Sequence, residues 1–205
     1  MAQIVFLDTN VILDYLEKRN RKVMDIVAQL LFFHQREKII LATSVFNIAE
    51  LIDKEFEIHL IGNFVSERMS YDEILKRKNN KKLSREIATK NRRSIERKIK
   101  DFIFDNQIRI LPFSFVNENE TERDQESKTY DDLYSLIYEY QFSSQDALII
   151  ATALSNKVTY FLSNDGDIIG QINNNGLMDA YNLRDKNLRE AFKNEVLDTL
   201  AEVLR

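Results

Sequence analysis

Apolar residues follow two spacings along the chain, a continuous run typical of a buried strand and a repeat typical of an amphipathic helix. Residues 3–7 (QIVFL) form the first continuous run, and residues 10–17 and 23–33 carry apolar side chains at helical spacing. A second run at 38–43 precedes Ser44, a residue type that often caps the start of a helix. The first quarter of the chain is therefore predicted to fold as strand, two helices, strand and helix.

The alternation of the two patterns continues to the end of the chain. Residues 60–105 have a helical pattern throughout and are polar in their middle, which indicates a helical insertion. The polar segment 117–127 offers nothing to bury and is predicted to be an exposed loop. We further predict strands at 108–115, 157–165 and 176–183, helices at 129–141, 145–154 and 189–204, and a turn-rich loop at 170–176.

Strands that alternate with helices predict a mainly parallel sheet with helices on both of its faces. We therefore expect an α/β fold with three layers (α/β/α) that is rich in helix, built as a single domain over residues 1–205 with a helical insertion at about 60–106. In such sheets ligands bind beyond the carboxyl ends of the strands. Polar residues at these ends are the first candidates for a functional site.

Composition narrows the chemistry that a site can use. The chain has no cysteine and two histidines, which excludes disulfides and thiolate sites and does not favour a zinc site built from imidazole. Any metal must then be held by oxygen. The first residues, MAQIVFLDTN, lack the pattern of a secretory signal, and no segment reaches the roughly 18 apolar residues of a membrane span. We expect a cytoplasmic protein without membrane contact.

The formal net charge of −4 conceals a strong segregation of charge along the chain. Residues 76–100 hold twelve Lys and Arg against two Glu, a local balance of +10, which leaves −14 for the remainder. Such a stretch is either a solvated helical face or a surface that contacts nucleic-acid phosphates, and it contains no aromatic residue to stack on bases. The candidate residues for contact with nucleic acid are Lys81, Lys82, Arg85, Arg92, Arg93 and Arg97.

Four acidic residues occupy comparable places beside the predicted strands. Asp8 ends the first strand, Asp146 starts a helix and Asp165 follows a later strand. Glu50 lies inside an otherwise apolar helix, where a charge is seldom buried unless it is paired or bound to a metal, although it could also face a groove. These four positions are the candidate site.

Each acid also has a purely structural interpretation. Asp8 and Asp146 can stabilise the N-terminus of a helix, and Asp146 stands three residues after Ser143, as in a capping box. Asp165 and Asp167 lie in SNDGD, an ordinary turn composition. Taken singly, these residues leave both interpretations open.

Taken together, the four carboxylates predict a metal site. The carboxyl ends of neighbouring parallel strands converge on one edge of the sheet, which would gather these side chains in one cleft. Like charges so gathered repel each other unless a divalent cation neutralises them. Carboxylate oxygens are hard ligands, so we expect Mg²⁺ or Mn²⁺ as the cofactor.

The acid-bearing segments, in their order along the chain, resemble the PIN-domain nucleases, a family that includes the toxin ribonucleases of bacterial toxin-antitoxin pairs (VapC type). FLDTNVILDYL resembles the opening strand of the family with its Asp-Thr-Asn signature, and SVFNIAEL resembles the helix with its second acid. SSQDALIIATAL and YFLSNDGDI resemble the segments with the third and fourth acids. The resemblance covers about 1–58 and 140–181; the compact toxins of the family are shorter and lack the basic stretch.

The resemblance implies a metal-dependent endoribonuclease that hydrolyses the phosphodiester bonds of RNA. It implies RNA as the substrate, a homodimer formed through helices and, for a toxin, an antitoxin whose tail would fill the groove. The residues that it implicates are Asp8, Glu50, Asp146 and Asp165 as catalytic metal ligands, Asp167 as an assisting or replacing ligand, and Asn10 and Ser163 as supporting polar neighbours.

Two other functions compete with this interpretation. The first is an inactive module of the same type, in which the acids are vestigial and the basic stretch binds RNA or protein. The second is a phosphotransferase of the haloacid dehalogenase type, suggested by a strand that ends in Asp8. That family has a second Asp two residues after its nucleophile, whereas Asn10 stands there in this chain, so the sequence does not favour it.

Overall fold

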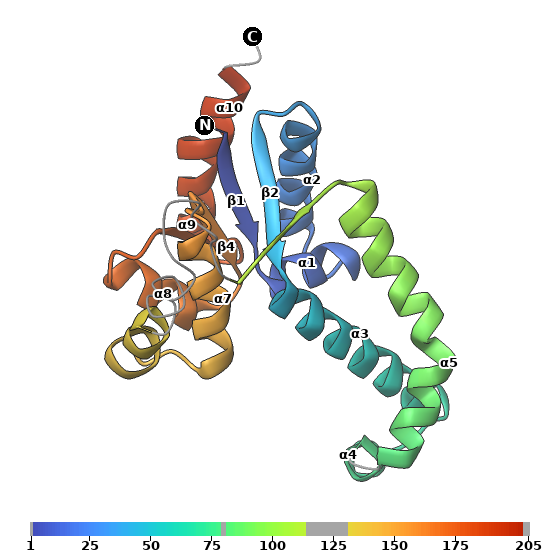
Figure 1. The fold of residues 1–205 in the computed structure, drawn as a ribbon. Coiled ribbons are helices and arrows are strands. Elements are labelled where there is room, and N and C mark those ends of the chain that lie inside the picture. The colour runs from blue at the N-terminus through green and yellow to red at the C-terminus, as the bar shows by residue number, and fades with distance from the viewer. Residues whose placement is uncertain (1, 79–80, 114–130, 203–205) are drawn as a thin grey trace. The chain divides into compact units, whose positions relative to one another are not determined.

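The computed structural model describes residues 2–78, 81–113 and 131–202, and for residues 78 and 81–88 it describes the backbone only. Contacts within the chain divide it into two compact units, which we call unit 1 (1–48 with 108–205) and unit 2 (49–107). The elements shown in Figure 1 are β1 (Gln3–Leu7), α1 (Thr9–Leu16), α2 (Arg21–Gln35), β2 (Ile39–Ser44), α3 (Val45–Ser66), α4 (Tyr71–Lys78), α5 (Lys81–Lys100), η1 (Asp101–Asp105), β3 (Arg109–Leu111), η2 (Ser135–Glu139), α7 (Ser144–Ser155), β4 (Tyr160–Ser163), α8 (Gly166–Asn174), β5 (Asp179–Asn182), α9 (Lys186–Phe192), η3 (Lys193–Leu197) and α10 (Asp198–Glu202).

Unit 1 is built on a sheet of five parallel strands in the order β3-β2-β1-β4-β5. The chain moves outward from β1 through β2 to β3 and then returns to the other side of β1 for β4 and β5. The direction of winding therefore reverses between β1 and β4. In open parallel sheets this reversal opens a crevice at the carboxyl ends of the two strands, and ligands bind there.

Helices cover both faces of the sheet, so the predicted three-layer α/β/α architecture is confirmed. Phe6 and Phe161, stacked with their ring centroids 5.2 Å apart on neighbouring strands, belong to one apolar core that includes Ile150 of α7 and Ile172 of α8. On the opposite face, reached by the alternate residues of β4 and β5, the rings of Tyr160 and Tyr181 contact Phe192 of α9. These rings, of which all but that of the half-buried Tyr160 are buried, contribute to the apolar packing that holds the sheet between its helices.

Unit 2 consists of helices. Most of α3 belongs to it, with α4, α5 and η1. Among the side chains that the structure describes in this unit, the buried ones are apolar apart from Glu55. The side chain of Glu55 is fully buried, and Lys98 of α5 donates a hydrogen bond to its Oε2 at 2.9 Å. The apolar residues that are buried in this unit are Leu51, Leu60, Phe64, Ile95, Ile99, Phe102 and Ile103.

Most predicted elements are present, and one prediction was wrong. Residues 170–176, predicted to be a turn-rich loop, belong largely to α8, which begins at Gly166 after Asp165 has capped its first turn. Helix α8 buries Ile169 and Ile172, so tertiary packing outweighs the low helix propensity of its Gly and Asn residues. The strand predicted at 108–115 is shorter, Arg109–Leu111, and the loop predicted at 117–127 lies outside the described residues.

Most of the described part of residues 60–105 is helical, as predicted, but residues 67–70 are not and separate α3 from α4. The predicted insertion at about 60–106 falls within unit 2. Among the residues that the structure describes, no helix has the length and apolar character needed to cross a membrane.

Candidate functional site

Asp8 is the centre of a polar network at the carboxyl end of β1. The strand ends at Leu7, and Asp8 adopts an extended conformation and caps α1. Its carboxylate is 5% exposed. Oδ1 accepts hydrogen bonds from the Thr9 amide (2.7 Å) and from Asn47 Nδ2 (2.8 Å), and Oδ2 accepts one from Ser163 Oγ (2.6 Å). These three donors are neutral groups, and they hold the carboxylate in one orientation.

The end of β4 supplies the second part of the network. Ser163 is fully buried, and besides its bond to Asp8 its hydroxyl accepts a hydrogen bond from Asn10 Nδ2 at 3.0 Å. Asn10 Oδ1 accepts one from the amide of Asn164 at 2.7 Å. The structure thus brings Asp8, Asn10 and Ser163 together at the reversal between β1 and β4.

Asn47 joins the end of β2 to the same network, and sequence reasoning missed it. Ser44 caps α3 as predicted, because its hydroxyl accepts from the Asn47 amide at 3.1 Å. The fully buried Asn47 side chain then donates both to Asp8 and to Thr9 Oγ1 (3.1 Å). Its position as a lone amide in the apolar run SVFNIAEL was the available signal, since a buried amide needs a partner.

A second missed group lies at the end of β5. Arg184 donates from Nε to Asp14 Oδ2 (2.9 Å) and from Nη2 to Asp14 Oδ1 (2.6 Å). Asp14, on α1, is 1% exposed, and Asn164 Nδ2 also donates to its Oδ2 at 2.9 Å. The hydrogen bond to Asp14 raises the pKa of Arg184, so this guanidinium is permanently charged. No local sequence pattern predicts the pair of Asp14 and Arg184, because the two residues are 170 positions apart.

Asp146 is used locally as a helix-capping residue. Ser143 caps α7, accepting from the Asp146 amide at 3.2 Å and donating to Asp146 Oδ2 at 2.6 Å. The predicted pairing of Ser143 with Asp146 is therefore confirmed. The Asp146 side chain is half-buried.

Asp165 caps α8 rather than shaping an isolated turn. Its Oδ1 accepts from the amides of Asp167 (2.9 Å) and Ile168 (3.3 Å), and its own amide donates to Ser163 Oγ (3.0 Å). Asp165 and Asp167 are exposed. Asp165 is thus linked to Asp8 through Ser163, which bonds both residues.

Glu50 lies on α3 within unit 2, and its side chain is half-buried. Asp8, Asp146 and Asp165 belong to unit 1. Among the described residues, no three Asp, Glu or His side chains form a group that could hold a metal ion. The predicted metal ligands, with Asp167, and the Mg²⁺ or Mn²⁺ cofactor stay predictions.

The donor set nevertheless has the chemistry that a hard cation requires. The carboxylate of Asp8 is fixed by neutral donors. Asn164, which joins the network through Asn10, has a buried Oδ1 that accepts no hydrogen bond within the described part of the chain. Carboxylate and amide oxygens are the ligands preferred by Mg²⁺ and Mn²⁺. The residues at the carboxyl edge of the sheet therefore offer the types of ligand oxygen that Mg²⁺ and Mn²⁺ prefer.

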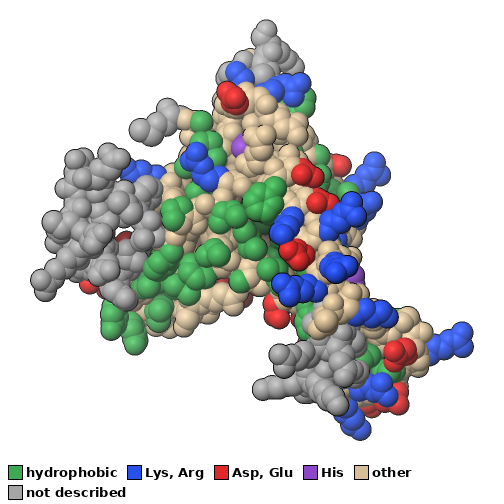
Figure 2. Space-filling view, turned by 45° about the vertical axis from the view of Figure 1, so that its right-hand side comes forward, with side chains coloured by type: hydrophobic (Ala, Val, Ile, Leu, Met, Phe, Trp, Pro, Cys, Tyr) green, Lys and Arg blue, Asp and Glu red, His purple; other side chains and the backbone are tan. Residues whose placement is uncertain are grey.

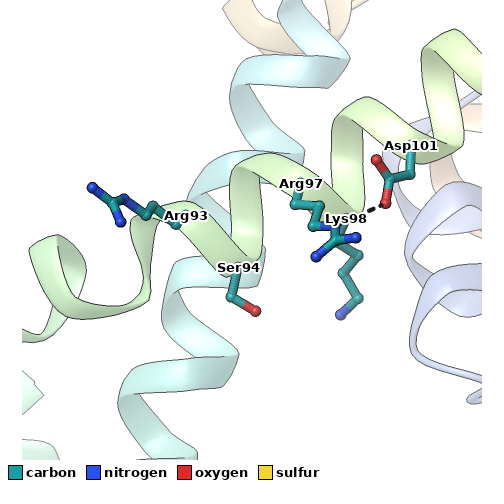
Figure 3. A pocket seen from close by; sticks show the side chains of 5 residues that line it. All are labelled: Arg93, Ser94, Arg97, Lys98 and Asp101. Carbon is teal, nitrogen blue, oxygen red and sulfur yellow. Dashed lines mark ion pairs between the residues drawn. The ribbon is translucent and has the colours of Figure 1, made fainter.

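The predicted nucleic-acid contacts lie on α5. Arg92, Arg93 and Arg97 are exposed, while the side chains of Lys81, Lys82 and Arg85 lie outside the described residues. A shallow hollow in unit 2 is lined by Arg93, Ser94, Arg97, Lys98 and Asp101 (Figure 3).

Several of the α5 cations have acidic partners. Arg97 Nε lies 3.7 Å from Asp101 Oδ2, and Lys98 is bonded to the buried Glu55. Figure 2 shows Lys and Arg side chains with Asp and Glu side chains among them. The local positive charge of the sequence is thus partly offset in space.

The sequence matches no family model, and no curated relative matches it. Among solved structures the chain is similar to the crystal structure of VapBC2 from Rickettsia felis bound to a DNA fragment from their promoter. The identity is 13%, the alignment covers 87% of this chain and 97% of that chain, and the TM-score is 0.48.

Proposed function

We propose that this protein is a metal-dependent endoribonuclease of the PIN type, with Asp8 as its central metal ligand. The observation that carries the proposal is the position of the Asp8 carboxylate, which is buried at the reversal between β1 and β4 and fixed by neutral donors. Ligands bind at such a reversal in open parallel sheets. A carboxylate that hydrogen bonds hold in one orientation there is suited to bind a hard cation.

The remaining acids complete the proposed site. Glu50, Asp146 and Asp165 are its further ligands, with Asp167 assisting Asp165. When bound, a Mg²⁺ or Mn²⁺ ion would lower the pKa of a water molecule and stabilise charge on the phosphate. Asn10 and Ser163 keep the Asp8 carboxylate in its orientation, and Asn47 does the same from the first turn of α3.

RNA is the proposed substrate, and α5 is proposed to contact its backbone. Exposed Arg92 and Arg93 carry charges suited to phosphate, and residues 76–100 contain no aromatic side chain for base stacking. Such contacts favour binding that depends on salt and not on sequence. The homodimer and the antitoxin partner implied by the resemblance are further parts of the proposal, to be tested by mass measurement and co-purification.

The test is cleavage of a labelled single-stranded RNA in Mn²⁺ by the wild-type protein and by Asp8→Asn. We expect cleavage by the wild type, none in EDTA, and a loss of at least about a hundredfold in Asp8→Asn, since the metal would lose its central carboxylate. Asp179→Asn is the matched control, because Asp179 is an exposed acid at the opposite, amino-terminal end of β5. Cleavage that survives both EDTA and Asp8→Asn would refute the proposal.

A second candidate function is a binding module without catalysis. It is favoured by the capping roles of Asp146 and Asp165 and by the lack of a three-carboxylate group among the described residues. This candidate predicts no heat of Mn²⁺ binding in calorimetry and an RNA affinity that Asp8→Asn leaves unchanged. The nuclease predicts Mn²⁺ binding that Asp8→Asn removes.

A further inference from the structure

We propose that Arg184 binds a phosphate of the RNA substrate at the carboxyl edge of the sheet, and that Asp14 positions it for this role. The inference deepens the proposed function and rests on it. Arg184 lies two residues beyond the end of β5, at the same edge of the sheet as Asp8. The carboxyl edge of the sheet therefore carries both the guanidinium of Arg184 and the carboxylate of Asp8.

A continuous chain of hydrogen bonds connects the two groups. Arg184 bonds Asp14, Asp14 accepts from the Asn164 side chain, and the Asn164 amide donates to Asn10. Asn10 donates to Ser163, which donates to Asp8. The chain crosses from β5 through β4 to β1, so the guanidinium and the carboxylate are held in one polar framework.

The backbone of Arg184 is fixed as firmly as its side chain. Its amide donates to Asn182 Oδ1 at 2.9 Å, and its carbonyl accepts from Arg189 Nη1 at 3.2 Å. Both partners are buried. A guanidinium held in this way loses little conformational entropy when it binds a ligand.

The guanidinium keeps donors available for such a ligand. Asp14 engages Nε and Nη2, whereas an arginine has five N–H groups, so Nη1 and the second N–H of Nη2 are not used by this pair. The Arg184 side chain is 51% exposed, while its carboxylate partner is 1% exposed. The exposed fork matches the bidentate geometry with which arginine binds phosphate.

The negative charge at the carboxyl edge of the sheet is a further argument for a phosphate-binding role of Arg184. RNA is a polyanion, and Asp8, Asp165 and Asp167 place negative charge at the edge where it would bind. The exposed guanidinium of Arg184, although it is paired with the buried Asp14, offers N–H donors at this edge to a phosphate that the metal does not contact. A purely structural role of the Arg184 pair would instead affect stability alone.

The test measures RNA binding without cleavage. All variants carry Asp8→Asn and are studied in EDTA, and the affinity for a labelled single-stranded RNA is measured by fluorescence anisotropy over a series of NaCl concentrations. Arg184→Gln is expected to weaken binding by at least about tenfold, the usual effect of losing one charge-assisted contact. The slope of log K against log[NaCl] is expected to fall by about 0.7, as for one lost contact with a single-stranded phosphate.

Two further variants keep the result independent of folding. Arg36→Gln is the matched control, because Arg36 is an exposed arginine of unit 1 just before β2, at the opposite edge of the sheet. Asp14→Asn/Arg184→Gln removes both charges, so it leaves no unpaired buried carboxylate, and its RNA affinity should fall as much as that of Arg184→Gln.

Two results would overturn the inference. One is an RNA affinity and a salt slope of Arg184→Gln equal to those of the Arg36→Gln control, and the other is no RNA binding by the parent Asp8→Asn protein. Cleavage by wild-type protein in Mn²⁺ tests the nuclease proposal separately.

Discussion

Ser163 at the end of β4 donates a hydrogen bond to the buried carboxylate of Asp8 at the end of β1, with 2.6 Å between Oγ and Oδ2. The two residues are 155 positions apart in the sequence and meet because their strands are neighbours in the sheet. This hydrogen bond links β1 to β4 at the candidate site, where the direction of winding of the sheet reverses.

Ser163→Ala should destabilise the fold, because Asp8 Oδ2 would lose a donor in a buried place. A hydrogen bond to a charged group contributes about 1.5–3 kcal/mol, so we expect the free energy of unfolding to fall by about 2 kcal/mol. Urea denaturation measures the change. Ser144→Ala, at the exposed start of α7, is the control and should change it by less than about 0.5 kcal/mol. Equal effects of the two variants would show that the bond to Asp8 contributes no stability.

Lys98→Met should destabilise unit 2, because it leaves the buried carboxylate of Glu55 without its ammonium partner. Removing one member of a buried pair costs about 3–5 kcal/mol, and the 31% exposure of Lys98 favours the lower end. Hydrogen exchange of the α3 and α5 amides measures the effect. Lys100→Met is the matched control, since Lys100 pairs with Glu96, which is 44% exposed. Exchange that is accelerated equally in both variants would contradict this prediction.

Stability should fall as the pH rises above about 10, the value at which an ordinary tyrosine ionises. Burial of the Tyr181 hydroxyl and its hydrogen bond to Glu195 raise the pKa of Tyr181, and burial also raises the pKa of Tyr160. Because both folded-state values are raised, the unfolded chain loses protons that the folded chain keeps, and ionisation favours unfolding.

Urea denaturation at pH values below and above 10 tests this dependence. Tyr181→Phe should flatten the decline, while Tyr134→Phe, whose side chain is exposed, should leave it as in the wild type. A stability that is constant or rising through this range would contradict the raised pKa values of the two tyrosines.

Much of the fold could be predicted from the sequence because buried parallel strands are continuous apolar runs. QIVFL and KIILAT each gave a strand, and the polar residue after each run marked the carboxyl edge. Helix α8 was missed since its Gly and Asn residues suggested a loop. Its start signal was present, with Asp165 as the cap and apolar residues at 168, 169 and 172 in helical spacing.

A residue of the candidate site could be predicted only where its neighbours in the sequence indicated its position in the fold. Asp8 stands out at the end of a strand. Asn10 and Ser163 follow only from the family resemblance and from no local context of their own. The pair of Asp14 and Arg184 could not be predicted, because α1 and the end of β5 come together only in the folded sheet. Capping of α7 by Ser143 with Asp146 could be predicted, since a cap depends on residues three positions apart.

The most direct test of the central claim is a crystal soaked in Mn²⁺ and measured for anomalous scattering at the metal. We predict a peak about 2.1 Å from a carboxylate oxygen of Asp8, the distance expected for such an ion, with oxygens of Glu50, Asp146 or Asp165 among its other ligands. The peak should be absent from crystals of Asp8→Asn. A well-ordered crystal with no anomalous peak at Asp8, in Mn²⁺ concentrations that support RNA cleavage, would contradict the account.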